Sequence, residues 1–454
     1  MEHWTEAKTF TDAEKMAAAY LMRYFGNQKI EYPINPFRML KDENILFVLM
    51  DFKNLEGVYI PASSTDDVPT VGINANRPIT RQRFSAAHEL CHHFRDADKQ
   101  ISCLIGSKNS IERFAEDFAA ALLMPIAELR VQVNERKNSN GTISMNDVLE
   151  IADFFGVSFQ ACLFRIAYLI QAIPGKTKAA ELVKRARKFG PDKERKRLHM
   201  TYTKLYADLI DCYQLQLSFK PTDYARCVFQ NEYIYNDSRM EGLKINLEQA
   251  SEIVTDIRLN EQNSIYCTEE KNAEVYMSIA GHYKMYQEIF SEPVKKSLDV
   301  YNLFVLNKLL FSYYPHPEFG GSARQNNTLV IGAKFDTVDY HEIFSELAKI
   351  DTEVRMFFSK KNEVLTSDYI KHVARVHHKI TVIHPFSEGN GRTSRAFMNV
   401  QFVRAGITPI YIKVEDKKEY LAALSRADQC DDYDELYEII FRLIIRSSVE
   451  LHRN

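Results

Sequence analysis

Apolar and polar positions alternate in short blocks over the first third of the chain. An amphipathic pattern predicts a helix over residues 12–25, and the apolar runs ILFVLM and GVYIPA predict two strands. After the loop SSTDDVPTVGINANRPIT, a long helical pattern begins at RQRFSAAHEL. Two more helices, separated at Gly156, are expected in MNDVLEIADFFGVSFQACLFRIAYLIQAI. This mixture of strands and helices predicts an α+β domain over residues 1–173.

From residue 201 onward the pattern is almost wholly helical. The exception is NNTLVIGAKFDTVDY, which predicts a β-hairpin with its turn around Gly332. Residues 174–200 carry ten Lys or Arg against three acids and are bracketed by Pro-Gly and Gly-Pro. That composition is typical of a solvated linker helix, and a binding arm is the alternative. We therefore predict a multidomain chain in which a basic linker joins domains 1–173 and 201–454.

Composition narrows the class of protein. The 454 residues exceed one ordinary core, and 45% apolar residues, 26% charged residues and a net charge of −3 are typical of a soluble globular protein. This balance argues against a nucleic-acid partner or a membrane surface. No apolar run has spanning length, and MEHWTEAKTFTDAEK lacks the pattern of a secretory signal. Seven scattered cysteines without CxxC pairs indicate reduced thiols in a cytoplasmic protein.

The segment RFSAAHELCHHF places two histidines on one face of a predicted helix. His88 and His92 are four residues apart, so both imidazoles can meet one metal ion. Glu89 stands beside them, where a carboxylate can take a proton from metal-bound water. A catalytic zinc site needs a third protein ligand, and the candidate is Glu112 in the next helical segment, IERFAEDFAAALLMP. Without this second segment, a chance pattern on a helix surface would explain the two histidines as well as a metal site does.

Residues 1–173 resemble the ImmA/IrrE family of metallopeptidases, which carry RFTLAHELGH-type and IERQADRFAAALLMP-type segments. The resemblance implies a zincin-like fold that binds Zn²⁺. It also implies that His88, His92 and Glu112 are the zinc ligands and that Glu89 is the general base.

Two positions depart from that family's pattern. Cys91 replaces the usual glycine, and Glu116 replaces the usual Asn or Asp. Cys91 either packs in the core or, as a thiolate, closes the open coordination position, which would make the site structural. His93 and Asp96 are expected to be solvated.

The segment HPFSEGNGRTSR, residues 384–395, lies between two predicted helices. Proline discourages helix at the residue before it, so the first helix ends at His384. Gly389 and Gly391 permit the backbone torsions of a tight loop. The free N–H groups of the following helix, which ends at Gly406, point into that loop together with the positive end of its dipole. This geometry binds phosphate.

Charged side chains complete this predicted phosphate site. Arg392 and Arg395 are three residues apart on one helix face and can clamp phosphate oxygens. Glu388 offers a hard oxygen to Mg²⁺, which bridges phosphates. His384 is the one nearby group whose unperturbed pKa suits a general base near neutral pH. The set indicates phosphoryl-type transfer, and a glycine-rich helix cap with solvated arginines is the alternative.

HPFSEGNGRTSR matches the Fic motif, HPFx(D/E)GNGRxxR, at every defined position, and the resemblance spans about residues 225–445. It implies transfer of AMP from ATP to a Ser, Thr or Tyr hydroxyl of a target protein, with His384 as the base and Glu388 holding Mg²⁺. Phe386 would anchor the loop, and a hairpin at residues 329–338 resembles the flap that pins the target segment by strand addition. The nucleotide-binding residues implied by the resemblance are Phe386, Gly389, Asn390, Gly391, Arg392 and Arg395.

The segment YNDSRMEGLKINLEQA resembles a helix of many Fic proteins that carries (S/T)xxxE(G/N). The resemblance implies an inhibitory helix near residues 236–258, in which Glu241 pairs with Arg395 and blocks the productive ATP pose. A surface acid is the alternative. Asp237 stands where Ser or Thr is usual, and it either caps the helix equally well or changes how firmly Glu241 is held.

The leading interpretation is a cytoplasmic fusion of a zinc metallopeptidase-like domain with an autoinhibited Fic adenylyltransferase that uses ATP and Mg²⁺. One alternative is a zinc endopeptidase that cleaves a regulator protein, with the Fic part as its regulatory partner. Others are a non-catalytic N-terminal recognition module and removal of AMP by the same residues. No membrane partner is expected, and the chain is compatible with a homo-oligomer.

Overall fold

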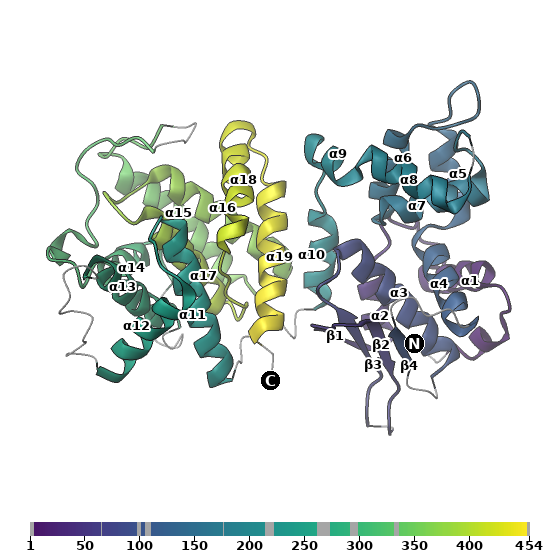
Figure 1. Cartoon of the computed structure of the whole chain (residues 1–454), viewed down its shortest axis with the longest axis horizontal. Coiled ribbons are helices and arrows are strands. Elements are labelled where there is room, and N and C mark those ends of the chain that lie inside the picture. The colour runs from purple at the N-terminus through teal and green to yellow at the C-terminus, as the bar shows by residue number, and fades with distance from the viewer. Residues whose placement is uncertain are drawn as a thin grey trace. The chain divides into compact units, whose positions relative to one another are not determined.

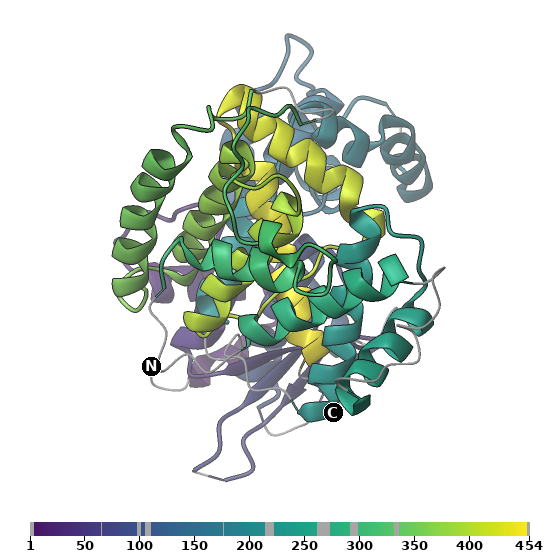
Figure 2. The ribbon, with the colours of Figure 1, turned by 90° about the vertical axis from the view of Figure 1, so that its left-hand side faces the viewer.

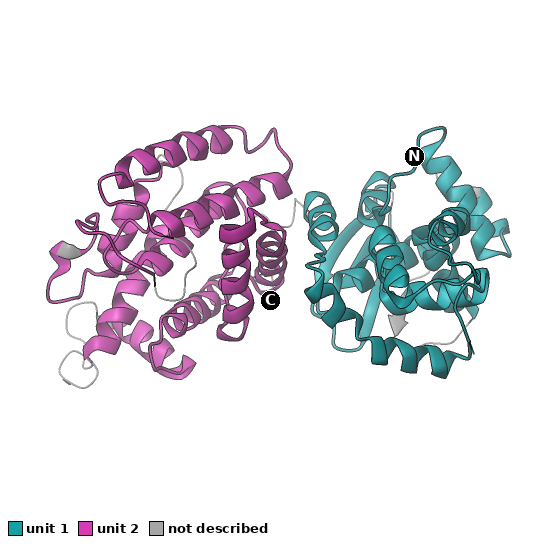
Figure 3. Ribbon diagram, turned by 90° about the horizontal axis from the view of Figure 1, so that it is seen from above, with its two compact units in different colours: residues 1–213 teal, residues 214–454 magenta. Residues whose placement is uncertain are grey.

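The computed structural model describes residues 4–64, 66–97, 101–104, 110–175, 177–213, 222–260, 273–290, 298–330 and 336–451. The chain divides into two compact units, residues 1–213 and 214–454 (Figure 3). In the described ranges, the first unit combines a sheet with helices and the second is helical. The predicted fold class, an α+β part followed by a mainly α-helical part, is confirmed. The turn of the predicted hairpin, residues 331–335, lies outside the described residues.

The first unit contains the sheet and the helices that cover it (Figure 1). Its elements are η1 (Thr5–Thr9), α1 (Ala13–Phe25), α2 (Pro36–Asp42), β1 (Leu46–Met50), β2 (Leu55–Ile60), β3 (Thr70–Asn74), α3 (Ile79–Arg95), β4 (Ile101–Leu104), α4 (Ser110–Leu123), α5 (Ile126–Asn134), α6 (Met145–Phe155), α7 (Phe159–Arg165), η2 (Ile166–Ile170), α8 (Ala179–Phe189), α9 (Pro191–Arg197) and α10 (Thr203–Cys212).

The sheet has the strand order β1-β3-β2-β4. β1 runs parallel to β3, whereas β2 pairs antiparallel with both β3 and β4. β3 lies inside the stretch predicted to be a loop. Its five residues are almost all buried, and Gly72 interrupts their short apolar run, so no alternating pattern marks them as a strand.

Helix α3 packs on β2 and β3, and α4 packs on both α3 and α1. Aromatic side chains fill the space between these helices. The ring of Tyr20 on α1 lies 5.0 Å from that of Phe94 on α3 and 6.5 Å from that of Phe118 on α4. Buried Arg83 donates to the carbonyls of Gly156 and Ile34, which ties α3 to the α6–α7 turn. The metal-binding pattern therefore lies on a helix fixed from several sides.

Residues 177–213 pack against the rest of the first unit and do not form a solvated linker. Leu182 and Ala186 of α8 are buried, and Phe189 stacks on Phe159 at 5.1 Å. The guanidinium of buried Arg195 pairs with Asp153 at 2.7 Å. Helix α10 packs on α2, so the boundary follows residue 213 instead of residue 200. The few apolar residues by which this segment packs are hard to recognise in the sequence because charged residues surround them.

The second unit is built from α-helices around α17. Figure 2 shows these helices from a direction perpendicular to that of Figure 1. Helix α17 is almost entirely buried and contacts α13, α14 and α16, while α19 packs on α16 and α11. The elements are α11 (Asp223–Met240), α12 (Leu247–Asn260), α13 (Ala273–Ile289), α14 (Asn302–Leu310), η7 (Pro317–Phe319), α15 (Ile343–Ser359), α16 (Thr366–Ile383), α17 (Asn390–Arg404), η8 (Val414–Asp416), α18 (Lys417–Cys430) and α19 (Asp434–Leu451).

In the described part of the chain, no single helix has both the length and the apolar character needed to cross a membrane. One pair of helical segments, Met145–Phe155 with Phe159–Ile170, meets both criteria together and is bent by 108°.

Candidate functional site

Three side chains of the first unit converge at one buried point. His88 Nε2 lies 3.1 Å from Glu112 Oε2 and 3.1 Å from His92 Nε2, and His92 Nε2 lies 3.8 Å from Glu112 Oε1. Donor atoms about 2.0–2.1 Å from a tetrahedral zinc ion would be about 3.3–3.4 Å apart, so this spacing fits zinc. Among the described residues, these three form the cluster able to hold a metal ion.

The local fold explains why these ligands meet. His88 and His92 are one turn apart on α3, and Glu112 lies in the first turn of α4, which packs against α3. His92 Nδ1 lies 3.0 Å from Asp96 Oδ2. A carboxylate there directs the other ring nitrogen toward a metal. The expectation that Asp96 is solvated is wrong. Its spacing of four residues from His92, on the same helix face, indicates this contact.

Glu89 is 1% exposed, and its carboxylate lies against strand β2 at Gly57. A Cβ at Gly57 would come within 2.4 Å of Glu89 Oε1, so any larger residue would push the carboxylate away. His93 is also not simply solvated, because its Nδ1 lies 3.2 Å from the Tyr59 hydroxyl.

Cys91 is also 1% exposed but is not part of the metal-binding cluster. Burial raises the pKa of its thiol, which favours the protonated form. Of the two interpretations of Cys91, the structure supports packing over closure of a coordination position.

In the second unit, the loop after α16 is held by the main chain and by buried side chains. His384 caps α16 with a φ of +52°, and the next residue is Pro385. Phe386 is 1% exposed and packs edge-on against Phe304 at 5.2 Å. Arg324 donates from Nε to the His384 carbonyl at 2.8 Å and from its backbone N–H to the Pro385 carbonyl at 2.9 Å. The loop thus has a fixed shape.

The glycine and asparagine positions form the turn into α17. Gly389 has a φ of +78°, and a Cβ there would lie 2.9 Å from Leu310 Cδ2, so the turn requires glycine. The amide of Asn390 bonds to the main-chain N–H and carbonyl of Phe386, at 2.9 and 2.7 Å. Its side chain therefore braces the loop. The N-terminus of α17 begins at this point.

A cavity of about 540 Å³ lies beside the loop. Its lining includes Phe386, Glu388, Asn307, Phe311, Tyr314 and His316. The exposed carboxylate of Glu388 is a donor of the kind that Mg²⁺ accepts from proteins in addition to phosphate oxygens. The guanidinium of Arg392 stands 5.6 Å from the centroid of the Phe311 ring. Burial lowers the pKa of His384, so its imidazole is neutral near pH 7.

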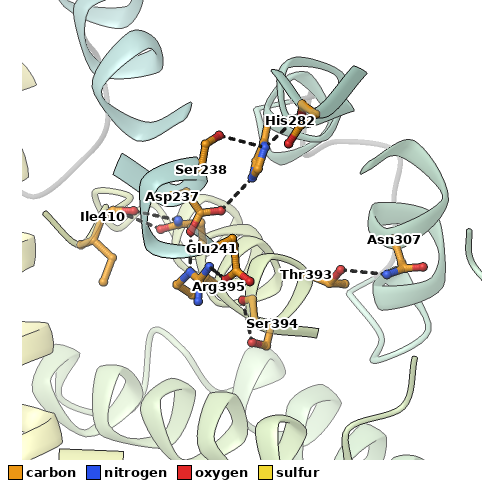
Figure 4. Close-up of polar contacts among 12 residues, drawn as sticks. Asp237, Ser238, Glu241, His282, Asn307, Thr393, Ser394, Arg395 and Ile410 are labelled. Carbon is orange, nitrogen blue, oxygen red and sulfur yellow. Dashed lines mark hydrogen bonds and ion pairs between the residues drawn. The ribbon is translucent and has the colours of Figure 1, made fainter. Parts of the chain in front are cut away.

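Arg395 lies between two carboxylates (Figure 4). Its Nε donates to Asp237 Oδ1 at 2.5 Å, and its Nη2 donates to Glu241 Oε1 at 2.6 Å. Asp237 is buried and also contacts His282 Nε2 at 3.1 Å, whereas 35% of the Glu241 side chain is exposed. Burial alone would raise the pKa of Asp237, but Arg395 and His282 hold it at about 2.

Glu241 does not lie inside one continuous helix. Helix α11 ends at Met240, Glu241 is its C-cap, and α12 begins only at Leu247. Gly242 has a φ of +93°, which ends the helix. A Cβ at Gly391 would lie 2.9 Å from both Glu241 Oε1 and Arg395 Nη1. The turn after α11 therefore contacts the loop directly, where the predicted phosphate site lies.

Two segments outside the motif also hold the loop. Asn307 Nδ2 donates to the Glu388 carbonyl at 3.1 Å. It also donates to Thr393 Oγ1 at 3.2 Å (Figure 4). Arg324 Nη2 also donates to the carbonyl of Val338, in one arm of the predicted hairpin. The two arms are joined where Thr337 Oγ1 donates to the Thr328 carbonyl at 2.6 Å. The sequence pattern did not reveal these supports because they depend on tertiary packing.

Comparisons with known proteins find a family match in each unit. Residues 40–167 match the family model described as IrrE N-terminal-like domain, and residues 297–402 match that of the Fic/DOC family. The chain thus matches two different family models, one in each unit. It carries an IrrE N-terminal-like domain in its first unit and a Fic/DOC domain in its second, which confirms both resemblances.

Two relatives show the extent of the similarity. Protein adenylyltransferase fic-1 of Caenorhabditis elegans is 27% identical over 199 residues, which cover 44% of this chain and 37% of that protein. Protein adenylyltransferase Fic of Nematostella vectensis is 41% identical over 73 residues, covering 16% and 17%. The chain thus spans well under two thirds of the length of these curated relatives. A solved structure of Fic-1 from C. elegans covers 74% of this chain and 91% of its own, at 16% identity and a TM-score of 0.44.

Proposed function

We propose that the second unit is a Fic-type protein adenylyltransferase that moves AMP from ATP to a hydroxyl of a target protein. The observation that carries this proposal is the braced loop of residues 384–395. This loop carries a histidine at the end of α16, an exposed carboxylate at Glu388 that lines a cavity, and Arg392 and Arg395 in the first turns of α17. The relatives named as protein adenylyltransferases support the same reaction.

In this reaction the target hydroxyl oxygen attacks the α-phosphorus of ATP, the bond to the β-phosphate oxygen breaks, and pyrophosphate leaves. His384 accepts the hydroxyl proton, which its lowered pKa permits at pH 7. The first N–H groups of α17 hold the α-phosphate, and Arg392 and Arg395 hold the outer phosphates. Glu388 would hold Mg²⁺, which would supply charge neutralisation in this reaction.

We further propose that Glu241 inhibits this reaction. Arg395 cannot bind the outer phosphates while its Nη2 is paired with Glu241, which lies against Gly391 at the start of α17. Because part of the Glu241 side chain is exposed and lies in a turn, it can leave without unfolding a helix.

The test is incubation with labelled ATP and Mg²⁺, followed by mass spectrometry of modified Ser, Thr and Tyr residues. We expect the Glu241→Gly variant to incorporate more AMP than the wild type, and the Glu241→Gly/His384→Ala variant to incorporate none. Equal incorporation by wild type and Glu241→Gly would rule out inhibition by Glu241. If an AMP-modified target loses AMP in the same mixture, removal of AMP replaces AMP transfer as the proposed reaction.

A second candidate function is favoured by the three-ligand cluster and by the IrrE-like match. We propose that the first unit is a zinc-dependent endopeptidase that cleaves a regulator protein. His88, His92 and Glu112 would hold Zn²⁺, which lowers the pKa of a bound water. Buried Glu89 would take the proton of that water. The Glu89→Gln variant should keep its zinc and lose proteolysis. If the substitution leaves both proteolysis and AMP transfer unchanged, the peptidase proposal fails.

A further inference from the structure

A groove of about 990 Å³ lies in the first unit between α3, α4 and α7. Its apolar surface is formed by side chains of these three helices, including Phe84, Phe114, Leu123 and Phe164, and by Tyr168 of η2. Pockets of about 300–1,000 Å³ hold most of the surface of a drug-sized ligand. The groove therefore has room for several side chains of a peptide.

The groove begins beside the metal-binding cluster. On α3, Phe84 is one turn before His88, and the two ring centroids are 6.3 Å apart. On α4, Glu116 is one turn after Glu112. Phe84 and Glu116 both line the groove, so it starts one turn from the ligands on each helix and leads away from them. A chain segment placed in it has one end next to the cluster.

The charges along the groove favour a positively charged occupant. Arg81 pairs with Glu56 at 3.2 Å, and Arg165 pairs with Glu14 at 2.7 Å. The lining includes four carboxylates, those of Asp12, Glu14, Glu116 and Asp117, and two guanidinium groups, those of Arg81 and Arg165. The groove therefore combines an apolar floor with an excess of negative charge.

We propose that this groove binds an extended peptide in which a large apolar side chain is next to Lys or Arg. The apolar side chain packs among Phe84, Phe114 and Phe164, and the basic side chain meets Glu116 and Asp117. This inference rests on the proposed peptidase function, for which the groove would select the substrate segment next to the metal.

Binding can be measured without catalysis in full-length protein carrying Glu89→Gln. Fluorescein-labelled peptides with Phe-Arg, Phe-Glu, Ser-Arg or Ser-Glu in one Gly/Ser-rich frame are titrated by fluorescence anisotropy. Burying one aromatic side chain is worth about 1.5–3 kcal/mol, so Phe-Arg should bind about tenfold to a hundredfold more tightly than Ser-Arg. Phe-Glu should bind more weakly than Phe-Arg, and Glu116→Lys should reverse that order.

Filling the groove provides the matched control. Ala120→Trp places an indole in the groove and should abolish Phe-Arg binding, whereas Ala180→Trp on the exposed face of α8 should not. Melting temperatures of both variants verify folding. Equal affinity for all four peptides, or unchanged binding by Ala120→Trp, overturns the proposal. So does a change of oligomeric state on Ala120→Trp without peptide binding, which would assign the groove to a second copy of the chain.

The outcomes separate the groove from the peptidase function. If the peptides bind selectively but the zinc-loaded wild type does not cleave them, the groove proposal stands and the peptidase proposal is refuted. If cleavage occurs but neither Ala120→Trp nor Glu116→Lys affects it, the peptidase proposal stands and the groove proposal is refuted.

Discussion

The two carboxylates on Arg395 differ in burial, and this difference leads to opposite outcomes when each is removed. Glu241 makes one charge-assisted hydrogen bond at 2.6 Å, and about a third of its side chain is exposed. Hydrogen bonds to charged groups contribute about 1.5–3 kcal/mol, and solvent exposure moves this one to the lower end. Release of about 1.5 kcal/mol corresponds to about a tenfold gain in productive ATP binding. We therefore expect Glu241→Ala to raise AMP incorporation about tenfold at ATP concentrations below saturation.

Asp237 is buried and bonds to both Arg395 and His282. Its removal leaves the buried guanidinium of Arg395 with one of its two carboxylate partners. Removing one partner of a buried ion pair costs about 3–5 kcal/mol. We expect Asp237→Ala to lower the unfolding free energy of the second unit by about this amount, without the gain in AMP incorporation.

The assay pairs initial rates with labelled ATP and chemical denaturation of the same samples. Glu248→Gln, an exposed acid on α12, is the matched control and should change neither. An equal gain in rate from Asp237→Ala and Glu241→Ala, with no loss of stability in either, would refute the reasoning from burial.

Three further predictions concern pH and metal. The pKa of Asp237 is lowered from 3.8 to about 2 in the folded protein. The ionised carboxylate therefore contributes about 2 kcal/mol to the free energy of unfolding above pH 4, and this contribution is lost as pH falls toward 2. The Asp237→Asn variant should lack this part of the pH dependence in denaturation experiments. Because burial lowers the pKa of His384 below 6.5, AMP transfer by Glu241→Gly should be flat between pH 7 and 8 and fall below pH 6.5, and a fall beginning above pH 7 would contradict its role as the base. Chelation should remove zinc and lower the melting temperature of the first unit, and Asp96→Ala should weaken zinc affinity by about 10–100-fold in a competition assay with a zinc-binding dye.

Local sequence spacing predicted the central parts of both sites. His88 and His92 share a helix face by their spacing alone, and the glycines around Asn390 predicted the loop before α17. These features depend on positions a few residues apart, where helix and loop geometry is fixed by the chain itself.

The remaining features depend on contacts between distant segments. Asp237 and Arg395 are 158 residues apart, and nothing near either residue indicates that His282 completes the cluster. The need for glycine at position 57 follows only from the packing of β2 against Glu89. The error in the linker has a similar origin, because Arg195 looks solvated in sequence yet is buried against Asp153.

Arg324 has a consequence for how the second unit responds to a target. Its guanidinium donates to the carbonyl of His384, in the loop of residues 384–395, and to the carbonyl of Val338, in one arm of the predicted flap. A strand that docks on that arm and shifts it would pull on the same side chain that fixes the histidine. If the proposed function holds, arrival of the target and alignment of His384 as the base would be linked through Arg324, a residue outside the motif.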